Sequence, residues 1–165
     1  MAEGNAGNGS LGTIVQISAS DGGVPKTRLD VATVGTNGIT VDRQRNTKAH
    51  GGPQRALCLF SAEVIEALRS EGHPITPGDV GENVTLRGIE WTRVRPGSRL
   101  RLGNEVLVEM TRYTTPCGHI QKYFHDGDSQ HISQDRNPGR SRVYGRVIEE
   151  GKLRPGDAAK LLAEA

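Results

Sequence analysis

Apolar and polar residues alternate in short runs along most of this chain, a pattern typical of β-strands with one buried face. Residues 12–18 alternate in this way and are rich in β-branched side chains, so we expect a strand there. Asn37-Gly38 stands between two such runs and predicts a hairpin with a type I′ turn, because both residues tolerate a positive φ. The same pattern predicts strands at 30–34, 39–42, 55–60, 83–88, 99–102, 105–111, 142–149 and 158–162.

One segment, residues 61–71, has the period of a helix instead. Its first residue, a serine, suits the N-cap position, and Val64, Ile65 and Leu68 form one apolar face. Pro-Gly pairs, at which type II turns are expected, lie at 77–78, 96–97 and 155–156. About eight strands and one main helix predict a mostly β fold, either a barrel or a sandwich.

Length and charge narrow the class of protein. The chain has 165 residues, 21 Lys and Arg against 19 Asp and Glu, and a formal net charge of +2. This surplus is too small to predict nucleic acid as the main partner, and no apolar run approaches the ~18 residues of a membrane helix. The start, MAEGNAGNGS, lacks the basic and apolar regions of a signal peptide. We therefore expect a flexible leader over 1–10, a single domain over 11–165, a cytoplasmic location and no membrane partner.

The two cysteines, Cys58 and Cys117, are too few for a disulfide framework, and a reducing compartment would keep both as thiols. Cys117 follows a predicted strand in Thr-Thr-Pro-Cys-Gly-His, two positions before His119. A thiol beside a cation attacks or ligates more readily, so this pattern indicates a reactive cysteine, with a buried structural cysteine as the alternative. Cys58 has only apolar neighbours in sequence and is expected to pack in the core.

Three histidines follow Cys117, at positions 119, 125 and 131. Their spacing, C-x-H-x5-H-x5-H, matches no compact zinc module, and the chain has no CxxC motif. The spacing therefore does not predict a zinc site. The segment 126–140 that carries the last of them is polar, and a loop of that length in a compact domain is more often functional than accidental.

Two groups of residues are suited to an anion. The paired glycines of His50-Gly51-Gly52 let backbone amides approach an anion closely. Arg140 and Arg142 carry guanidinium donors that match phosphate or sulfate. Ordinary turns and solvated arginines are the alternatives. No P-loop, GxSxG or GxGxxG motif is present, which disfavours nucleotide hydrolysis, α/β-hydrolase chemistry and Rossmann cofactors.

Five motifs are informative because of their order along the chain. They are His50-Gly-Gly52 leading into Arg55-Ala-Leu57, Pro77-Gly-Asp-Val-Gly-Glu-Asn83, Thr111 to Pro116-Cys117, Ser141-Arg-Val-Tyr-Gly-Arg-Val147, and Gly151 with Pro155-Gly-Asp157. In this order they resemble the MOSC domain, the module named after the C-terminal region of molybdenum cofactor sulfurases. The likeness covers roughly residues 12–162. It implies a closed or partly open β-barrel with one main helix and short helical segments.

The resemblance also implies a cleft that receives molybdenum cofactor, a pterin that carries a dithiolene and a phosphate. Cys117 is then expected to ligate molybdenum, for which a soft thiolate is suited, or to carry a persulfide sulfur. The residues that the resemblance implies at the cofactor are His50, Gly51, Gly52, Asn83, Arg140 and Arg142.

This chain departs from the family pattern beside the cysteine. Tyr113-Thr114 stands where many members carry Pro-Arg, two residues before the Pro-Cys pair. An anion contact from that arginine is therefore not expected here, and Arg112 replaces it only in part. Fused sulfurases also have an N-terminal domain that uses pyridoxal phosphate to make the persulfide. The residues of this chain do not support pyridoxal phosphate binding.

Three functions follow from the resemblance. The first, which we favour, is a molybdenum-dependent oxidoreductase that reduces N-hydroxylated compounds such as hydroxylaminopurines. It would use Cys117 as metal ligand, His119 as proton donor and a separate electron donor. The second is a sulfur carrier or sulfurtransferase in which Cys117 accepts a persulfide from a cysteine desulfurase. The third is a non-catalytic module that holds molybdopterin. The enzymatic functions act on a small-molecule substrate, and in the oxidoreductase segment 126–140 would shape its entrance.

Overall fold

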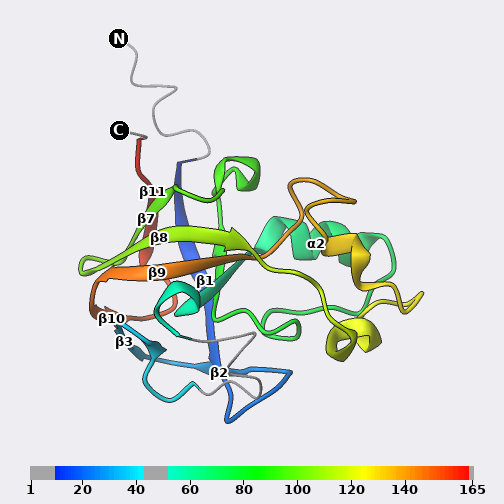
Figure 1. Cartoon of the computed structure of the whole chain (residues 1–165), viewed down its shortest axis with the longest axis horizontal. Helices are drawn as coiled ribbons and strands as arrows, with labels where there is room; N and C mark the ends of the chain where they lie inside the picture. Colours follow the sequence, from blue (N-terminus) through cyan, green and yellow to red (C-terminus); the bar gives the residue numbers. More distant parts are fainter. Residues whose placement is uncertain (1–9, 43–51, 164–165) are drawn as a thin grey trace.

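Within the described residues, seven strands close into a β-barrel (Figure 1). The computed structural model describes residues 10–42 and 52–163. The strands are β1 (Leu11–Ala19), β5 (Leu57–Ser61), β6 (Val84–Arg87), β7 (Arg99–Leu102), β8 (Val106–Tyr113), β9 (Val143–Glu149) and β11 (Ala158–Leu161). Around the barrel they follow the order β1, β11, β7, β8, β9, β5, β6 and back to β1. Neighbours are antiparallel except β5 and β6, which are parallel.

A second, smaller sheet and several helical segments complete the fold. β10 (Gly151–Leu153), β3 (Ala32–Gly35) and β4 (Gly38–Ile39) pair in that order, and β2 (Thr27–Leu29) pairs with the end of β1. The helical elements are α2 (Ala62–Ser70) and the 3₁₀ helices η1 (Pro53–Arg55), η2 (Trp91–Arg93), η3 (Gly118–Tyr123) and η4 (Ser129–Ile132). α2, η3 and η4 lie together at the end of the molecule away from β7 and β11 (Figure 1). We call residues 62–75 and 118–133 the helical lobe.

The interior of the barrel is apolar because alternate residues of its strands point inward. Leu100 and Leu102 of β7 and Val106 and Val108 of β8 are fully buried. The arginines on either side of Leu100 ion-pair on the outer surface instead. The alternation that predicted these strands therefore describes the barrel core, and the strand at 99–102 has the predicted bounds.

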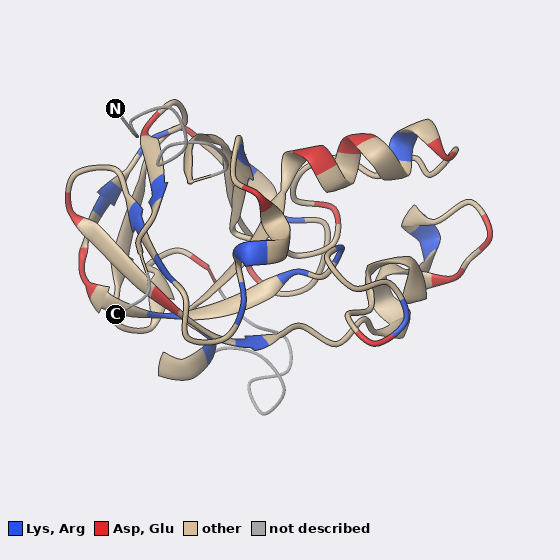
Figure 2. Cartoon of the chain, turned by 90° about the horizontal axis from the view of Figure 1, so that it is seen from above, with Lys and Arg blue, Asp and Glu red and all other residues tan. Residues whose placement is uncertain are grey.

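The main helix forms where the sequence predicts it. Ser61 is the N-cap residue, and its Oγ accepts the backbone N–H of Val64 at 3.2 Å. Glu63 lies in the first turn and Arg69 in the last, where the helix dipole favours each charge, and Figure 2 shows this order along α2. The buried face of α2 joins a second apolar cluster, formed by Phe60, Ile65, Leu68, Ile75, Val80, Ile120, Phe124 and Ile132.

The predicted hairpin is present, but its turn is not the expected one. Gly35 of β3 pairs with Gly38 of β4, so Thr36 and Asn37 form the loop. No non-glycine residue in the described ranges has a positive φ, and Asn37 therefore does not adopt the type I′ conformation. The positive φ, 103°, falls on Gly38, where a Cβ would lie 2.1 Å from the Ala56 carbonyl oxygen. The type I′ prediction was wrong, because this close approach fixes the glycine at the start of the returning strand.

The other differences concern short elements. β2 and β10 were not predicted, because three residues are too few to show an alternating pattern. The polar segment 126–140 contains η4 and is not a loop throughout. Gly78, Gly97 and Gly156 have φ of 90°, 94° and 92°, as the predicted type II turns require. No helix in the described part of the chain combines the length and apolar character needed to cross a bilayer.

Candidate functional site

Cys117 lies on the segment that leaves the barrel at the end of β8. The backbone N–H of Thr114 donates to the Arg142 carbonyl oxygen at 3.0 Å, which fixes the start of this segment beside β9. Cys117 has an extended backbone and occupies the N-cap position of η3. Its thiol is free and half-buried, and His119 in the first turn of η3 is exposed. The thiol is therefore reachable from solvent.

The second cysteine has a different environment. Cys58 is fully buried, as predicted, and burial raises the pKa of its thiol. Its surroundings are not purely apolar, however, since its Sγ lies 3.7 Å from Thr114 Oγ1 and the charge of Arg142 opposes the rise in pKa. Cys58 thus belongs to a buried polar group that its sequence neighbours do not reveal.

Asn83 is the centre of this buried polar group. Its Oδ1 accepts the Cys58 backbone N–H at 2.9 Å, and its Nδ2 donates to the Ser18 carbonyl oxygen at 3.2 Å and to Asp42 Oδ2 at 2.8 Å. Asp42 also pairs with the buried ammonium group of Lys26 at 2.7 Å. The amide of Asn83 therefore joins β5 to the end of β1 and to the residue before segment 43–51.

Arg142 and Glu82 carry buried polar atoms without partners. Nη1 of Arg142 donates to the Val80 carbonyl oxygen at 2.6 Å. Within the described ranges, Nε and Nη2 of Arg142 and Oε1 of Glu82 are buried and have no hydrogen-bond partner. Burial raises the pKa of Glu82 to about 7, an effect that the charge of Arg142 only partly offsets. Buried polar groups are nearly always paired, so the unpaired donors of Arg142 indicate a position for an acceptor.

Arg140, only two residues away, is already paired. Its guanidinium group donates to both carboxylate oxygens of Glu71, at 2.9 and 2.6 Å, and this pair lies at the end of α2. Gly52 is exposed, has a φ of 79° and precedes η1. His50 and Gly51, the other two residues predicted at the cofactor, lie outside the described residues. The roles predicted for these residues and for Cys117 and His119 remain predictions.

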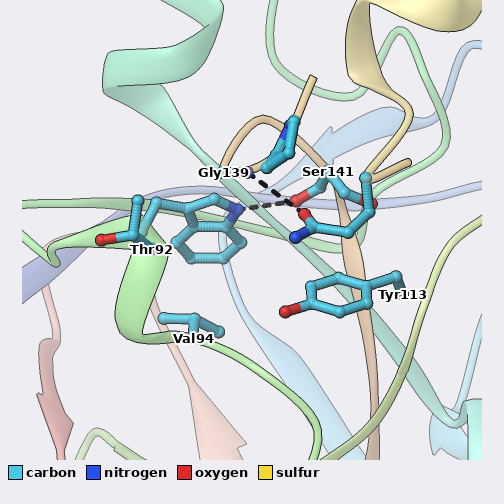
Figure 3. A pocket seen from close by; sticks show the side chains of 8 residues that line it. Thr92, Val94, Tyr113, Gly139 and Ser141 are labelled. Atoms are coloured by element: carbon cyan, nitrogen blue, oxygen red, sulfur yellow. Dashed lines mark hydrogen bonds between the residues drawn. The ribbon is translucent and has the colours of Figure 1, made fainter. Parts of the chain in front are cut away.

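A small pocket of about 210 Å³ opens beside Tyr113 and Ser141 (Figure 3). Tyr113, the last residue of β8, and Trp91 of η2 form two of its walls, and the Trp91 Nε1–H donates to the Ser141 carbonyl oxygen at 2.7 Å. The full lining is Trp91, Thr92, Val94, Tyr113, Gln134, Pro138, Gly139 and Ser141. No motif in the sequence marks this pocket, and the one available signal is a tryptophan in a chain with 4% aromatic residues.

The structure also brings histidines together: two of the three grouped by sequence, His125 and His131, meet His73 instead of His119. The His73 ring is stacked on His125, with centroids 4.5 Å apart, and lies 4.5 Å from the His131 ring. His131 Nε2 contacts Asp126 Oδ2 at 2.7 Å, and this bond lowers the pKa of Asp126 to about 2. Burial, followed by the two neighbouring histidines, lowers the pKa of His73. His73 comes from the end of α2, so the spacing of the later histidines could not include it.

Known proteins resemble this chain in sequence and in structure. A family model described as the MOSC domain matches residues 46–160. YflK of Bacillus subtilis (strain 168) is 31% identical over 123 residues, which are 74% of this chain and 54% of YflK. A Gibberella moniliformis protein named Reductase is 26% identical over 120 residues, 70% of this chain and 21% of that protein. The crystal structure of YiiM from Geobacillus stearothermophilus has a TM-score of 0.73 at 26% identity, over 92% of this chain and 75% of that one.

These matches cover different fractions of the proteins compared and therefore support different conclusions. The chain spans about half the length of YflK and a smaller part of the fungal protein, so the activities of those longer proteins are not transferred with the likeness. The family model, in contrast, covers most of the chain, including β5 to β9 and the Cys117 segment. The barrel described here is also the fold of the YiiM structure. The chain therefore belongs to the MOSC domain family.

Proposed function

We propose that this protein binds molybdenum cofactor through Cys117 and reduces N-hydroxylated compounds with electrons from a separate donor. The observation that carries the proposal is the contrast between the two thiols. Cys117 is free and half-buried at the N-cap of η3, whereas Cys58 is buried. Membership of the MOSC family and the name of the fungal relative, Reductase, support the same function.

The chemistry of the available donors fits the cofactor. A thiolate is a soft ligand suited to molybdenum, and Cys117 is the free thiol that solvent can reach. The two unpaired N–H groups of Arg142 would donate to the phosphate of the pterin. Arg140 would contribute less to phosphate binding than the sequence suggested, because Glu71 already accepts two hydrogen bonds from its guanidinium group.

When bound, the molybdenum centre would supply the two electrons that break an N–O bond. The reduction of R–NHOH to R–NH₂ and water also consumes two protons, and His119 would deliver protons at the substrate oxygen because it is exposed and lies two residues after Cys117. Asn83 would act indirectly, since its three hydrogen bonds hold β5 and β1 in place beneath the site.

Replacement of each cysteine tests the proposal. Protein from a molybdenum-replete host is analysed for molybdenum and pterin, and for reduction of a hydroxylaminopurine with reduced viologen as donor. We expect Cys117→Ser to lose molybdenum and activity while its circular dichroism stays unchanged, and Cys58→Ala to keep the metal. Full molybdenum content and activity in Cys117→Ser would overturn the proposal.

A sulfur-carrier function is the second candidate, because a reachable thiolate can also accept a persulfide. Incubation with a cysteine desulfurase and cysteine would then add ~32 Da at Cys117, which mass spectrometry of the digested protein detects. The adduct would be absent from Cys117→Ser. Stoichiometric molybdopterin with neither turnover nor persulfide would indicate the third function, a non-catalytic binding module.

A further inference from the structure

We propose that Glu71, His73 and His131 form a binding site for a divalent transition-metal ion, with Zn²⁺ as the ion that suits these donors. One potential ligand atom from each of the three side chains lies within 4.8 Å of the others. Two imidazoles and a carboxylate are a common ligand set for Zn²⁺, which binds nitrogen at about 2.0–2.1 Å. The site lies in the helical lobe and includes neither Cys117 nor Arg142.

The three ligands come from two segments that fold onto each other. Glu71 is the C-cap residue of α2, and His73 follows it after Gly72, whose φ of 100° turns the chain. His131 lies in η4, and its ring also packs on Phe124 with centroids 5.8 Å apart. A bound ion would therefore tie the end of α2 to η4 without a change in the course of either segment.

The surroundings of His131 resemble those of a metal-binding histidine. Its Nε2 contacts Asp126 Oδ2 at 2.7 Å, which leaves Nδ1 as the second ring nitrogen. Asp126 is held in turn, because its Oδ1 accepts the Asp128 backbone N–H at 3.0 Å. Histidines that ligate metals usually bond a carboxylate through the other ring nitrogen, which orients the ring and raises its basicity. The Asp126 contact would have this effect at His131.

Each of the other two ligands already has a hydrogen-bond partner that metal binding must accommodate. His73 is buried, and its Nδ1 accepts the His125 backbone N–H at 3.2 Å, so its Nε2 is the ring nitrogen that can ligate without loss of this bond. Glu71 already accepts two hydrogen bonds from Arg140, but a carboxylate has about four lone-pair sites, so Arg140 and the ion can share it. Asp126, which contacts His131, adds a second carboxylate beside Glu71, and both charges attract a cation.

The first test measures Zn²⁺ binding to untagged protein treated with EDTA and dialysed. We expect isothermal titration calorimetry to give one ion per chain and the melting temperature to rise when Zn²⁺ is in excess. His131→Ala and Glu71→Gln should each weaken binding by at least about tenfold, and Asp126→Asn by about tenfold through the orientation of His131. Circular dichroism without metal should be the same for all variants, because these side chains lie at or near the surface.

His119→Ala is the matched control, since it removes an exposed histidine from the same region but outside the cluster, and its Zn²⁺ affinity should equal that of the wild type. The proposal is overturned if the wild type takes up no Zn²⁺, or if His131→Ala binds as tightly as His119→Ala. Molybdenum content enters neither measurement, so this result is independent of the proposed function.

Discussion

The barrel and the helical lobe are stabilised in different ways. Within residues 10–42 and 52–163, twenty-two buried side chains, most of them on strands, form the core of the barrel and of the small sheet packed with it. Hydrogen-bonded ladders join the seven barrel strands in a closed circle. The lobe has a smaller apolar cluster beneath one helix and two 3₁₀ helices. Polar contacts, such as the ion pair of Arg140 with Glu71 and the histidine cluster, lie around it.

The difference indicates how the stability of each region responds to a substitution. A closed ladder opens only when the whole barrel unfolds, whereas an element held by a small cluster can open locally at lower free energy. The proposed cofactor ligand Cys117 lies on the segment that passes from one region to the other. Substitutions in the lobe are therefore expected to affect the Cys117 site more than the free energy of global unfolding. Substitutions in the barrel are expected to affect the free energy of global unfolding more than the site.

Equivalent truncations in the two cores give the largest expected effect. Leu100→Ala in the barrel should lower the free energy of unfolding by about 2–5 kcal/mol, because it leaves a cavity in a closed core. Ile132→Ala in the lobe, although equally buried, should cost less than about 2 kcal/mol in global stability, because the lobe can open locally. Urea unfolding monitored by fluorescence of Trp91, which belongs to the barrel core, measures both. Equal losses would contradict the separation of the two regions.

Glu82, at the boundary between the regions, should make stability depend on pH. Burial raises its folded pKa from 4.5 to about 7, so between these values the folded state binds the proton and the unfolded state does not. Stability then falls as pH rises through this window, by up to about 3 kcal/mol from this group. Urea unfolding at pH 5 and pH 8 should show the fall in wild type, and Glu82→Gln should lack that part of it. Parallel pH profiles for the two proteins would argue against a proton on Glu82.

The smallest effect concerns the cap of α2. Ser61→Ala removes the acceptor of the Val64 N–H and should destabilise the helix by about 1 kcal/mol. Ser70→Ala at the exposed other end should change stability by less than about 0.5 kcal/mol. Amide hydrogen exchange should show the loss in α2 and leave β7 and β8 protected. If exchange in the barrel accelerates as much as in α2, the helix and barrel open together.

Local pattern was sufficient to predict most of the barrel, because alternation is a property of neighbouring residues. The strand at 99–102 and the cap at Ser61 illustrate this. The hairpin turn could not be predicted from Asn37-Gly38 alone, since the position of Gly38 depends on the backbone of Ala56, which is distant in sequence. The barrel itself, as opposed to a sandwich, followed from the family resemblance.

The site was predicted less completely, because its parts meet only after folding. Cys117 and Arg142 were identified by residue type and motif, but nothing local distinguished Arg140, which is paired with Glu71, from Arg142, two of whose nitrogens lack partners. The neighbours of Cys58 likewise come from segments distant in sequence. His73 joins His131 only because α2 and η4 pack on one apolar cluster, and no spacing rule covers residues so far apart.

The pairing of β1 with β11 also constrains how the molecule forms on the ribosome. Residues 11–13 of β1 pair with residues 158–160 of β11. During synthesis, β1 therefore leaves the exit tunnel well before the strand that completes its pairing. Until then, the edges of β1 and β7 that β11 will cover remain open to other chains. Contacts this distant in sequence slow folding, so this interval is when the chain is most exposed to edge-to-edge association.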